Sequence, residues 1–123
     1  MLYFFMEKEK NRSACPVACF LDILGDRWTM LIVRDLLLGA KKYKDFLASP
    51  EKITTNILAE RLKRLETEGL VKKEAYQNNP IRYSYSLTQK GKDLGPLMKS
   101  MISWAQKYKD EVIRFAPNKN DKA

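Results

Sequence analysis

The sequence predicts a mainly α-helical domain that carries one small β-hairpin. Apolar residues recur at steps of three and four along most of the chain, which is the spacing of one helix face. Two short strand-like stretches, at 70–76 and 82–87, flank a segment of turn-forming residues and indicate the hairpin. A length of 123 residues suits a single domain with one core.

The composition restricts the classes of function. The 23 Lys+Arg exceed the 15 Asp+Glu, and the formal net charge of +8 favours an acidic partner such as nucleic acid. There is no histidine, which excludes Ser-His-Asp and Cys-His catalysis. Two cysteines are too few for a disulfide scaffold, favour a reducing compartment and make a poor metal site. We therefore expect no enzyme activity, no metal and no cofactor.

The two ends of the chain differ from the region between them. The first six residues are apolar, but they are too short for a signal h-region and have no positive n-region before them. They belong to a predicted N-terminal extension, 1–14, or they pack on a partner subunit. The domain is predicted at 15–115 and a polar tail at 116–123. No apolar stretch approaches the ~20 residues of a membrane span, so we expect a cytoplasmic, nucleoid-associated protein with no membrane partner.

Helix-start and helix-stop residues set the boundaries of the predicted helices. Pro16 suits the first turn of a helix, and Gly39 suits the position just after one. Suitable N-terminal caps are Thr54 or Thr55 for one helix and Thr88 for the last helix. The last helix contains Pro96, which we expect to bend it. The predicted helices cover residues 16–24, 28–39, 43–47, 54–68 and 89–115.

The hairpin completes the predicted architecture. Residues 77–80 are rich in turn formers and join the two predicted strands. Residues 41–43 are a candidate for a third, very short strand. Helices joined by short linkers and followed by a basic two-stranded hairpin are the arrangement of a winged helix-turn-helix. The order of elements alone therefore predicts that fold.

Four motifs resemble the HxlR family of bacterial and archaeal transcriptional regulators. Cys-Pro precedes the first helix, Gly-x-x-Trp lies at 25–28, Leu-x-x-Leu-Glu-x-x-Gly-Leu at 62–70, and Tyr-Ser-Leu-Thr at 85–88 before a glycine. The resemblance runs from residue 15 to about residue 104. It implies a DNA-binding homodimer with a winged helix-turn-helix fold that controls nearby genes. Thr55-Asn56 stands where the family often has Pro-Arg, which bears on the operator sequence rather than on the fold.

The helix at 54–68 is the candidate recognition helix. Three leucines at 58, 62 and 65 share its inner face, so the other residues point outward. Amide, carboxylate, ammonium and hydroxyl groups can read base edges in a major groove, whereas arginines can hold phosphates. Glu60 accepts from a cytosine amino group or pairs with Arg64. Periodicity alone also fits an ordinary solvated face; the resemblance favours DNA. The candidate contacts are Thr54, Thr55, Asn56, Ala59, Glu60, Arg61, Lys63 and Arg64.

Arg82 is the candidate contact of the hairpin. A cation on a projecting loop can enter a minor groove or follow the DNA backbone. The tyrosines at 76, 83 and 85 alternate along the hairpin. We expect them to pack against a helix rather than to stack on bases.

Cys15 is the candidate sensor of oxidants or electrophiles. It precedes Pro16 at a helix start, where unpaired N–H groups and the positive dipole end stabilise a thiolate, as does nearby Arg12. In the HxlR family some members use a cysteine at this position as a sensor, through alkylation or a bond between subunits, and others keep it without a known redox role. A structural role therefore stays open. Cys19 is expected to be a buried small apolar residue.

The last helix carries more apolar residues than it can bury in a small domain. Such a surplus marks a subunit interface. In a two-fold dimer the recognition helices lie one DNA turn apart, ~34 Å, and read a pseudo-palindromic operator. The predicted interface consists of Phe20, Leu97, Met101, Trp104 and Tyr108.

The favoured function is sequence-specific regulation of transcription. The expected partners are double-stranded DNA and a second copy of the chain, with a small molecule or an electrophile as a candidate effector. The alternative is a winged helix that docks onto another protein without binding DNA. That alternative predicts association that salt does not weaken.

Overall fold

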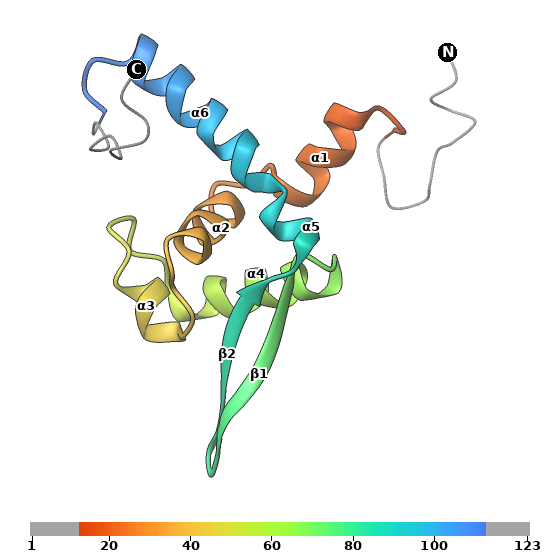
Figure 1. The fold of residues 1–123 in the computed structure, drawn as a ribbon, viewed down its shortest axis with the longest axis vertical. Helices are drawn as coiled ribbons and strands as arrows, with labels where there is room; N and C mark the ends of the chain where they lie inside the picture. Colours follow the sequence, from red (N-terminus) through yellow and green to blue (C-terminus); the bar gives the residue numbers. More distant parts are fainter. Residues whose placement is uncertain (1–12, 113–123) are drawn as a thin grey trace.

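The computed structural model describes residues 13–112. Helices α2, α3 and α4 form a body from which the β1–β2 hairpin projects, while α1 and α6 extend from the other side (Figure 1). This arrangement confirms the predicted winged helix-turn-helix fold, and we call the hairpin the wing. Within residues 13–112, no helix is both long and apolar enough to cross a membrane. The elements are α1 (Pro16–Leu24), α2 (Thr29–Leu37), α3 (Tyr43–Leu47), α4 (Thr55–Thr67), β1 (Val71–Asn78), β2 (Ile81–Leu87), α5 (Gln89–Lys92) and α6 (Leu94–Tyr108).

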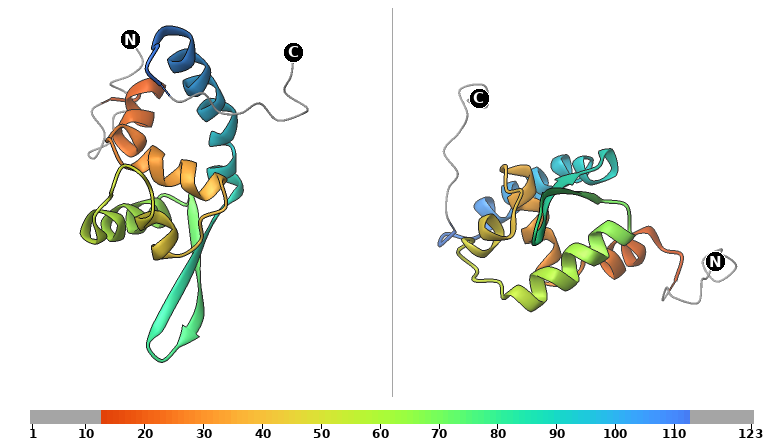
Figure 2. Two further views of the ribbon diagram at one scale, coloured as in Figure 1. Left: turned by 90° about the vertical axis from the view of Figure 1, so that its left-hand side faces the viewer. Right: turned by 90° about the horizontal axis from the view of Figure 1, so that it is seen from below.

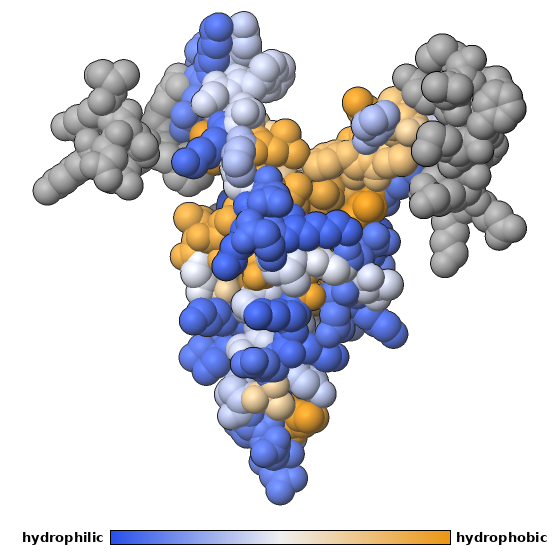
Figure 3. Space-filling view, turned by 45° about the vertical axis from the view of Figure 1, so that its right-hand side comes forward, coloured by the Kyte–Doolittle hydropathy of each residue, from blue (hydrophilic) through white to orange (hydrophobic). Residues whose placement is uncertain are grey.

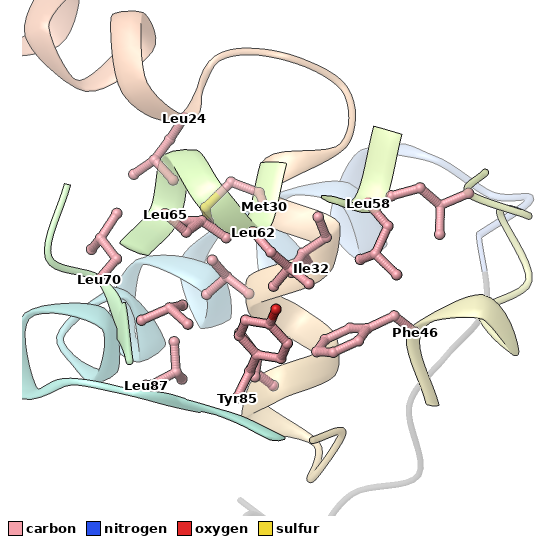
Figure 4. Packing of buried hydrophobic residues seen from close by; sticks show 14 of the residues in the cluster. Leu24, Met30, Ile32, Phe46, Leu58, Leu62, Leu65, Leu70, Tyr85 and Leu87 are labelled. Atoms are coloured by element: carbon pink, nitrogen blue, oxygen red, sulfur yellow. The ribbon is translucent and has the colours of Figure 1, made fainter. Parts of the chain in front are cut away.

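One face of α4 lies at the centre of the core. The predicted stripe is confirmed, because Leu58, Leu62 and Leu65 are at most 1% exposed. Figure 4 shows these side chains converging with Ile32 of α2 and Phe46 of α3. Burial of this apolar face is the main contribution that holds α4 in the domain. The opposite face of the same helix is left to solvent.

The wing is an antiparallel pair that reaches well beyond the helices, as the left view of Figure 2 also shows. Val71 pairs with Leu87 at its base and Asn78 with Ile81 at its tip. Both strands are longer than predicted, so only residues 79 and 80 remain between them. A register shift between Ala75 and Gln77 marks a bulge, which increases the local twist.

The wing tyrosines divide between its base and its tip. Tyr85 is buried, and its ring lies 6.1 Å from that of Tyr43 on α3, as expected for packing against a helix. Tyr83 is half-buried and packs against the edge of the core. Tyr76 is exposed, and the Lys42 ammonium lies 4.2 Å above its ring. The packing prediction is therefore right for Tyr85 and wrong for Tyr76.

The predicted short strand at 41–43 is wrong. Tyr43 is the first residue of α3, and an Asp45 carboxylate oxygen accepts hydrogen bonds from the backbone amides of Lys41 and Lys42, at 2.9 and 3.0 Å. These amides therefore hold the start of a helix instead of pairing with a strand.

The predicted last helix is two helices. We expected a bend at Pro96, but the helix is broken at Asp93, three residues earlier. A proline ring clashes with the carbonyl group four residues earlier, which here belongs to Lys92. Pro96 is then in the first turn of α6, where its missing N–H costs no hydrogen bond. The helix ends at Tyr108, before the predicted 115, and residues 113–115 lie outside the described part.

The start of α5 is fastened to the end of α4. Thr88 caps α5 as predicted, since its hydroxyl oxygen accepts from the Gly91 amide at 3.2 Å. The same hydroxyl donates to the Gly69 carbonyl oxygen at 2.6 Å, and Lys90 Nζ donates to the Glu68 carbonyl oxygen at 2.6 Å. Position 91 requires glycine, because a Cβ there would collide with the carbonyl oxygen of Leu70. These contacts place α5 directly against the last residues of the candidate recognition helix.

Candidate nucleic-acid interface

The outer face of α4 presents a row of polar groups to solvent. Its N-terminus is capped as predicted, with the Ile57 amide donating to the Thr54 hydroxyl at 3.4 Å. The cap fixes where the helix begins, and the buried leucines fix which face turns outward. Together they set the direction of the side chains that the sequence assigns to DNA. Six of those residues are exposed: Thr54, Thr55, Asn56, Ala59, Glu60 and Lys63.

The two arginines of α4 lie differently. Arg61 and Arg64 are half-buried, and both bind Asp26 in the turn between α1 and α2. Arg61 Nε donates to Asp26 Oδ2 at 2.8 Å, and Arg64 Nη2 donates to Asp26 Oδ1 at 2.6 Å. Glu60 pairs with Arg61, although the helix spacing suggested Arg64 as its partner. In the DNA-free protein these arginines therefore have a protein carboxylate as their partner.

Sequence reasoning missed Asp26. It lies inside the Gly-x-x-Trp motif, so its position was noted, but no spacing rule connects a turn residue with a helix 35 residues later. The sequence signal that could have identified Asp26 was a carboxylate three residues before Thr29, the first residue of α2. That position predicts a helix cap but not the two arginines.

The wing presents cations along its length. Arg82 is exposed and faces Gln77 across the hairpin near its tip. Lys73 is engaged within the protein, because its ammonium lies 4.5 Å from the Tyr83 ring and 3.8 Å from a Glu66 carboxylate oxygen. Arg82 is therefore better placed than Lys73 to meet a ligand beyond the tip.

Cys15 is the N-cap of α1, with Pro16 as the first helical residue, as predicted. Both cysteines are free and half-buried, so the expectation that Cys19 is fully buried is wrong. The Cys19 thiol donates to the Ser13 carbonyl oxygen at 3.4 Å. Arg12 lies outside the described residues. Among residues 13–112, no group of three or more candidate ligands could hold a metal ion.

Apolar side chains remain uncovered on α1 and α6. Leu97, Met101, Trp104 and Tyr108 are exposed, and the rings of Trp104 and Tyr108 lie 5.6 Å apart. Phe20, the predicted partner on α1, is half-buried against the core. Figure 3 shows hydrophobic surface over α1 and in the hollow between α1 and α6, while hydrophilic residues cover most of the body and the wing. Sequence analysis overlooked two further exposed residues of α1, Val17 and Leu21.

Comparison with known proteins agrees with this geometry. The HxlR-like helix-turn-helix family matches residues 23–113. The HTH-type transcriptional regulator YdeP of Bacillus subtilis strain 168 is 37% identical over 103 residues, which are 84% of this chain and 80% of YdeP. The crystal structure of PA1607 superposes with a TM-score of 0.76 and 34% identity over 91% of this chain and 80% of its own.

The redox regulator HypR in its oxidized form superposes with a TM-score of 0.69 and 32% identity, over 78% of this chain and 99% of HypR. The names of YdeP and HypR describe regulators rather than enzymes, which points to a protein that is not an enzyme. The match of the family to most of the described residues, together with the helix-turn-helix and wing seen here, places the protein: it belongs to the HxlR-like helix-turn-helix family of transcriptional regulators.

Proposed function

We propose that this regulator binds double-stranded DNA sequence-specifically, with α4 in the major groove. The observation that carries the proposal is the division of α4 into a fully buried leucine face and an exposed polar face. Asn56 and Lys63 lie on the exposed face, and these side-chain types pair with adenine and guanine edges, respectively. We assign base reading to these two residues, with Thr54, Thr55, Ala59 and Glu60 around them.

The wing supplies a second contact. Arg82 on β2 is exposed near the tip of a hairpin that extends far from the body (Figure 1). A guanidinium there reaches phosphates or a minor groove beside the site read by α4. This contact adds affinity for any DNA sequence, as does the net charge of +8.

A homodimer completes the proposed DNA-binding unit. The exposed apolar side chains of α6 and α1 are a surface that a second copy of the chain would cover. Two-fold symmetry then presents two α4 helices to successive major grooves, ~34 Å apart, and calls for a pseudo-palindromic operator. Action on chromosomal DNA places the protein, in our proposal, in the cytoplasm at the nucleoid.

Cys15 is the proposed site of regulation. It is the N-cap residue of α1, whose exposed Val17 and Leu21 belong to the proposed subunit boundary, so a modification there acts close to that boundary. A quinone adds to the thiolate and forms a C–S bond. Alternatively, diamide accepts two electrons from two thiols, one from each subunit, and a disulfide forms. The likeness to the redox regulator HypR supports a redox response.

The decisive experiment measures binding of the reduced protein to its own upstream intergenic DNA and to scrambled DNA at ~150 mM salt. A specific regulator is expected to prefer the upstream fragment by ~10³-fold or more. Equal and weak binding to both DNAs would contradict the proposal, because charge alone would then explain the interaction. The winged helix would in that case be a protein-docking module.

A further inference from the structure

Asp26 accepts more hydrogen bonds than a helix cap requires. Its Oδ2 accepts from the backbone amides of Trp28 and Thr29, at 3.0 and 3.2 Å, and from Arg61 Nε at 2.8 Å. Its Oδ1 accepts from Arg64 Nη2 at 2.6 Å and from the Thr29 hydroxyl. One carboxylate thus starts α2 and also holds two side chains of α4. The turn between α1 and α2 is thereby joined to the candidate recognition helix.

The cluster is partly shielded from water, and Arg64 Nε within it is buried without a hydrogen-bond partner. The side chain of Asp26 is 23% exposed, that of Arg61 23% and that of Arg64 33%. Thr29 is fully buried, and its hydroxyl oxygen accepts from Arg64 Nη2 at 2.9 Å. Burial opposes the charged form of Asp26, but the hydrogen bonds from Thr29 and Arg61 outweigh it and hold the pKa of this carboxyl far below its ordinary value. The folded protein therefore favours the ionised form of Asp26.

The position of the Asp26 carboxylate changes which side chains of α4 are available to contact DNA. Free arginines on a recognition helix bind phosphates, and such contacts raise affinity for every sequence without distinguishing among them. Here Asp26 occupies both guanidinium groups, and Glu60 adds a second partner for Arg61. Asn56 and Lys63 remain exposed on the same helix.

We propose that Asp26 is a specificity-determining positioning residue, which withholds Arg61 and Arg64 from phosphate and fixes α4 so that Asn56 and Lys63 discriminate between sequences. The inference rests on the DNA-binding function proposed above. Asp26 touches no DNA itself. It acts through the two arginines, and its effect is measured as a specificity ratio and a salt dependence rather than as affinity alone.

The first test is Asp26→Asn, which keeps the shape of the side chain and its acceptor for the backbone amides but removes the charge. Affinity for the upstream intergenic DNA and for scrambled DNA is measured between about 50 and 200 mM salt, a range over which phosphate contacts make affinity fall steeply. We expect the log–log salt slope on scrambled DNA to steepen by about 1–2, because each phosphate contact contributes about 0.9. The preference for upstream DNA is expected to fall by ~10-fold or more. Asp110→Asn makes the same charge change beyond the end of α6 and is expected to leave the slope unchanged.

The second test adds Arg61→Gln and Arg64→Gln to Asp26→Asn. The salt slope is expected to return to that of the wild type, because the guanidinium groups that would bind phosphate are then absent. In the wild-type background, the same two substitutions are expected to leave the slope unchanged. These arginine variants also test the inference if Asp26→Asn fails to fold, as judged by circular dichroism.

Two outcomes would overturn the inference. One is an Asp26→Asn variant that loses affinity equally for both DNAs with no change in slope, as a merely structural residue would. The other is a slope that falls by about 0.9 for each arginine removed from the wild type, since that would show the arginines already bound to phosphate. A wild-type protein that does not distinguish the two DNAs would instead contradict the proposed function.

Discussion

The backbone amide of Tyr85 donates a hydrogen bond to the carbonyl oxygen of Lys41 at 2.7 Å. This bond joins the second strand of the wing to the segment between α2 and α3. Because the Tyr85 ring is also buried in the core, the base of the wing is held at two points while its tip is solvated. Residues near the tip, where we propose a DNA contact, thus lie on an anchored arm.

Arg82→Ala tests the contact made by that arm. We expect weaker binding to all DNA sequences and a salt slope that is smaller by about 1, because one phosphate contact is lost. Lys99→Ala removes an equal charge from an exposed position on α6 and serves as the control. Titrations with upstream and scrambled DNA at several salt concentrations provide the measurement. An unchanged slope would remove Arg82 from the interface.

Asn56→Ala and Lys63→Ala test base reading by α4. Each is expected to weaken binding to the upstream DNA by about 1–3 kcal/mol, and to weaken binding to scrambled DNA much less, because hydrogen bonds to base edges exist only at the correct site. Thr67→Ala, at the exposed end of the same helix, is the control. Equal losses on both DNAs would contradict the assignment.

Cys15→Ser tests the proposed sensor. Treatment with a quinone or diamide is expected to release the wild-type protein from its upstream DNA and to leave the Cys15→Ser complex intact. Cys19→Ser, one helical turn later, is expected to keep the response to the quinone, because that thiol is held by the Ser13 carbonyl group. Electrophoretic retardation of the DNA reports both results. Release of the Cys15→Ser protein by either reagent would end the sensor hypothesis.

Trp104→Ala tests the proposed dimer. Trp104 is 63% exposed in the single chain, and a buried tryptophan at an interface often contributes about 2 kcal/mol or more. We therefore expect the dimer dissociation constant, measured by sedimentation equilibrium, to rise by ~30-fold or more. Leu38→Ala changes another exposed apolar residue, just after α2, and is expected to leave it unchanged. A wild-type protein that sediments as a monomer would refute this interface.

Acid unfolding tests the ion pair between Arg34 and Glu51. Arg34 donates two hydrogen bonds to the Glu51 carboxylate, at 2.7 and 2.9 Å, and this lowers the pKa of Glu51 from 4.5 to about 2. A pKa that is lower in the folded state gives stability that is complete above the unfolded value and is lost as the pH falls. The stability difference between wild type and Glu51→Gln is thus expected to shrink from about pH 5 to about pH 2, as measured by urea unfolding. Glu111→Gln is the control, and a difference that stays constant with pH would contradict the prediction.

Local signals predicted most of the fold. Thr54 and Thr88 mark the starts of two helices because a cap depends on residues only three positions away. Two of the errors arose where a residue acts on the segment that precedes it. Asp45 takes the amides that residues 41 and 42 would have given to a strand, and Pro96 interrupts the helix one turn before itself.

The candidate site was predicted in part. Helical periodicity identified the exposed face of α4, because the buried leucines determine which residues turn outward. It could not assign partners to Arg61 and Arg64, since Asp26 reaches them only after α1, α2 and α4 have packed. Single polar contacts between residues 35 and 38 positions apart leave no periodic trace in the sequence.

The candidate recognition helix, α4, is held by Asp26 before α2, and the two residues that follow it are held by Thr88 and Lys90 at α5. Only Asp93 separates α5 from α6, the helix that carries most of the proposed subunit boundary. In such a dimer, the distance between the two α4 helices follows from how the subunits meet and not from the residues that face the bases. Substitutions at the boundary would therefore change the length of the central spacer that an operator must have, while each half-site keeps its sequence. Spacer length and half-site sequence could then diverge independently among related regulators.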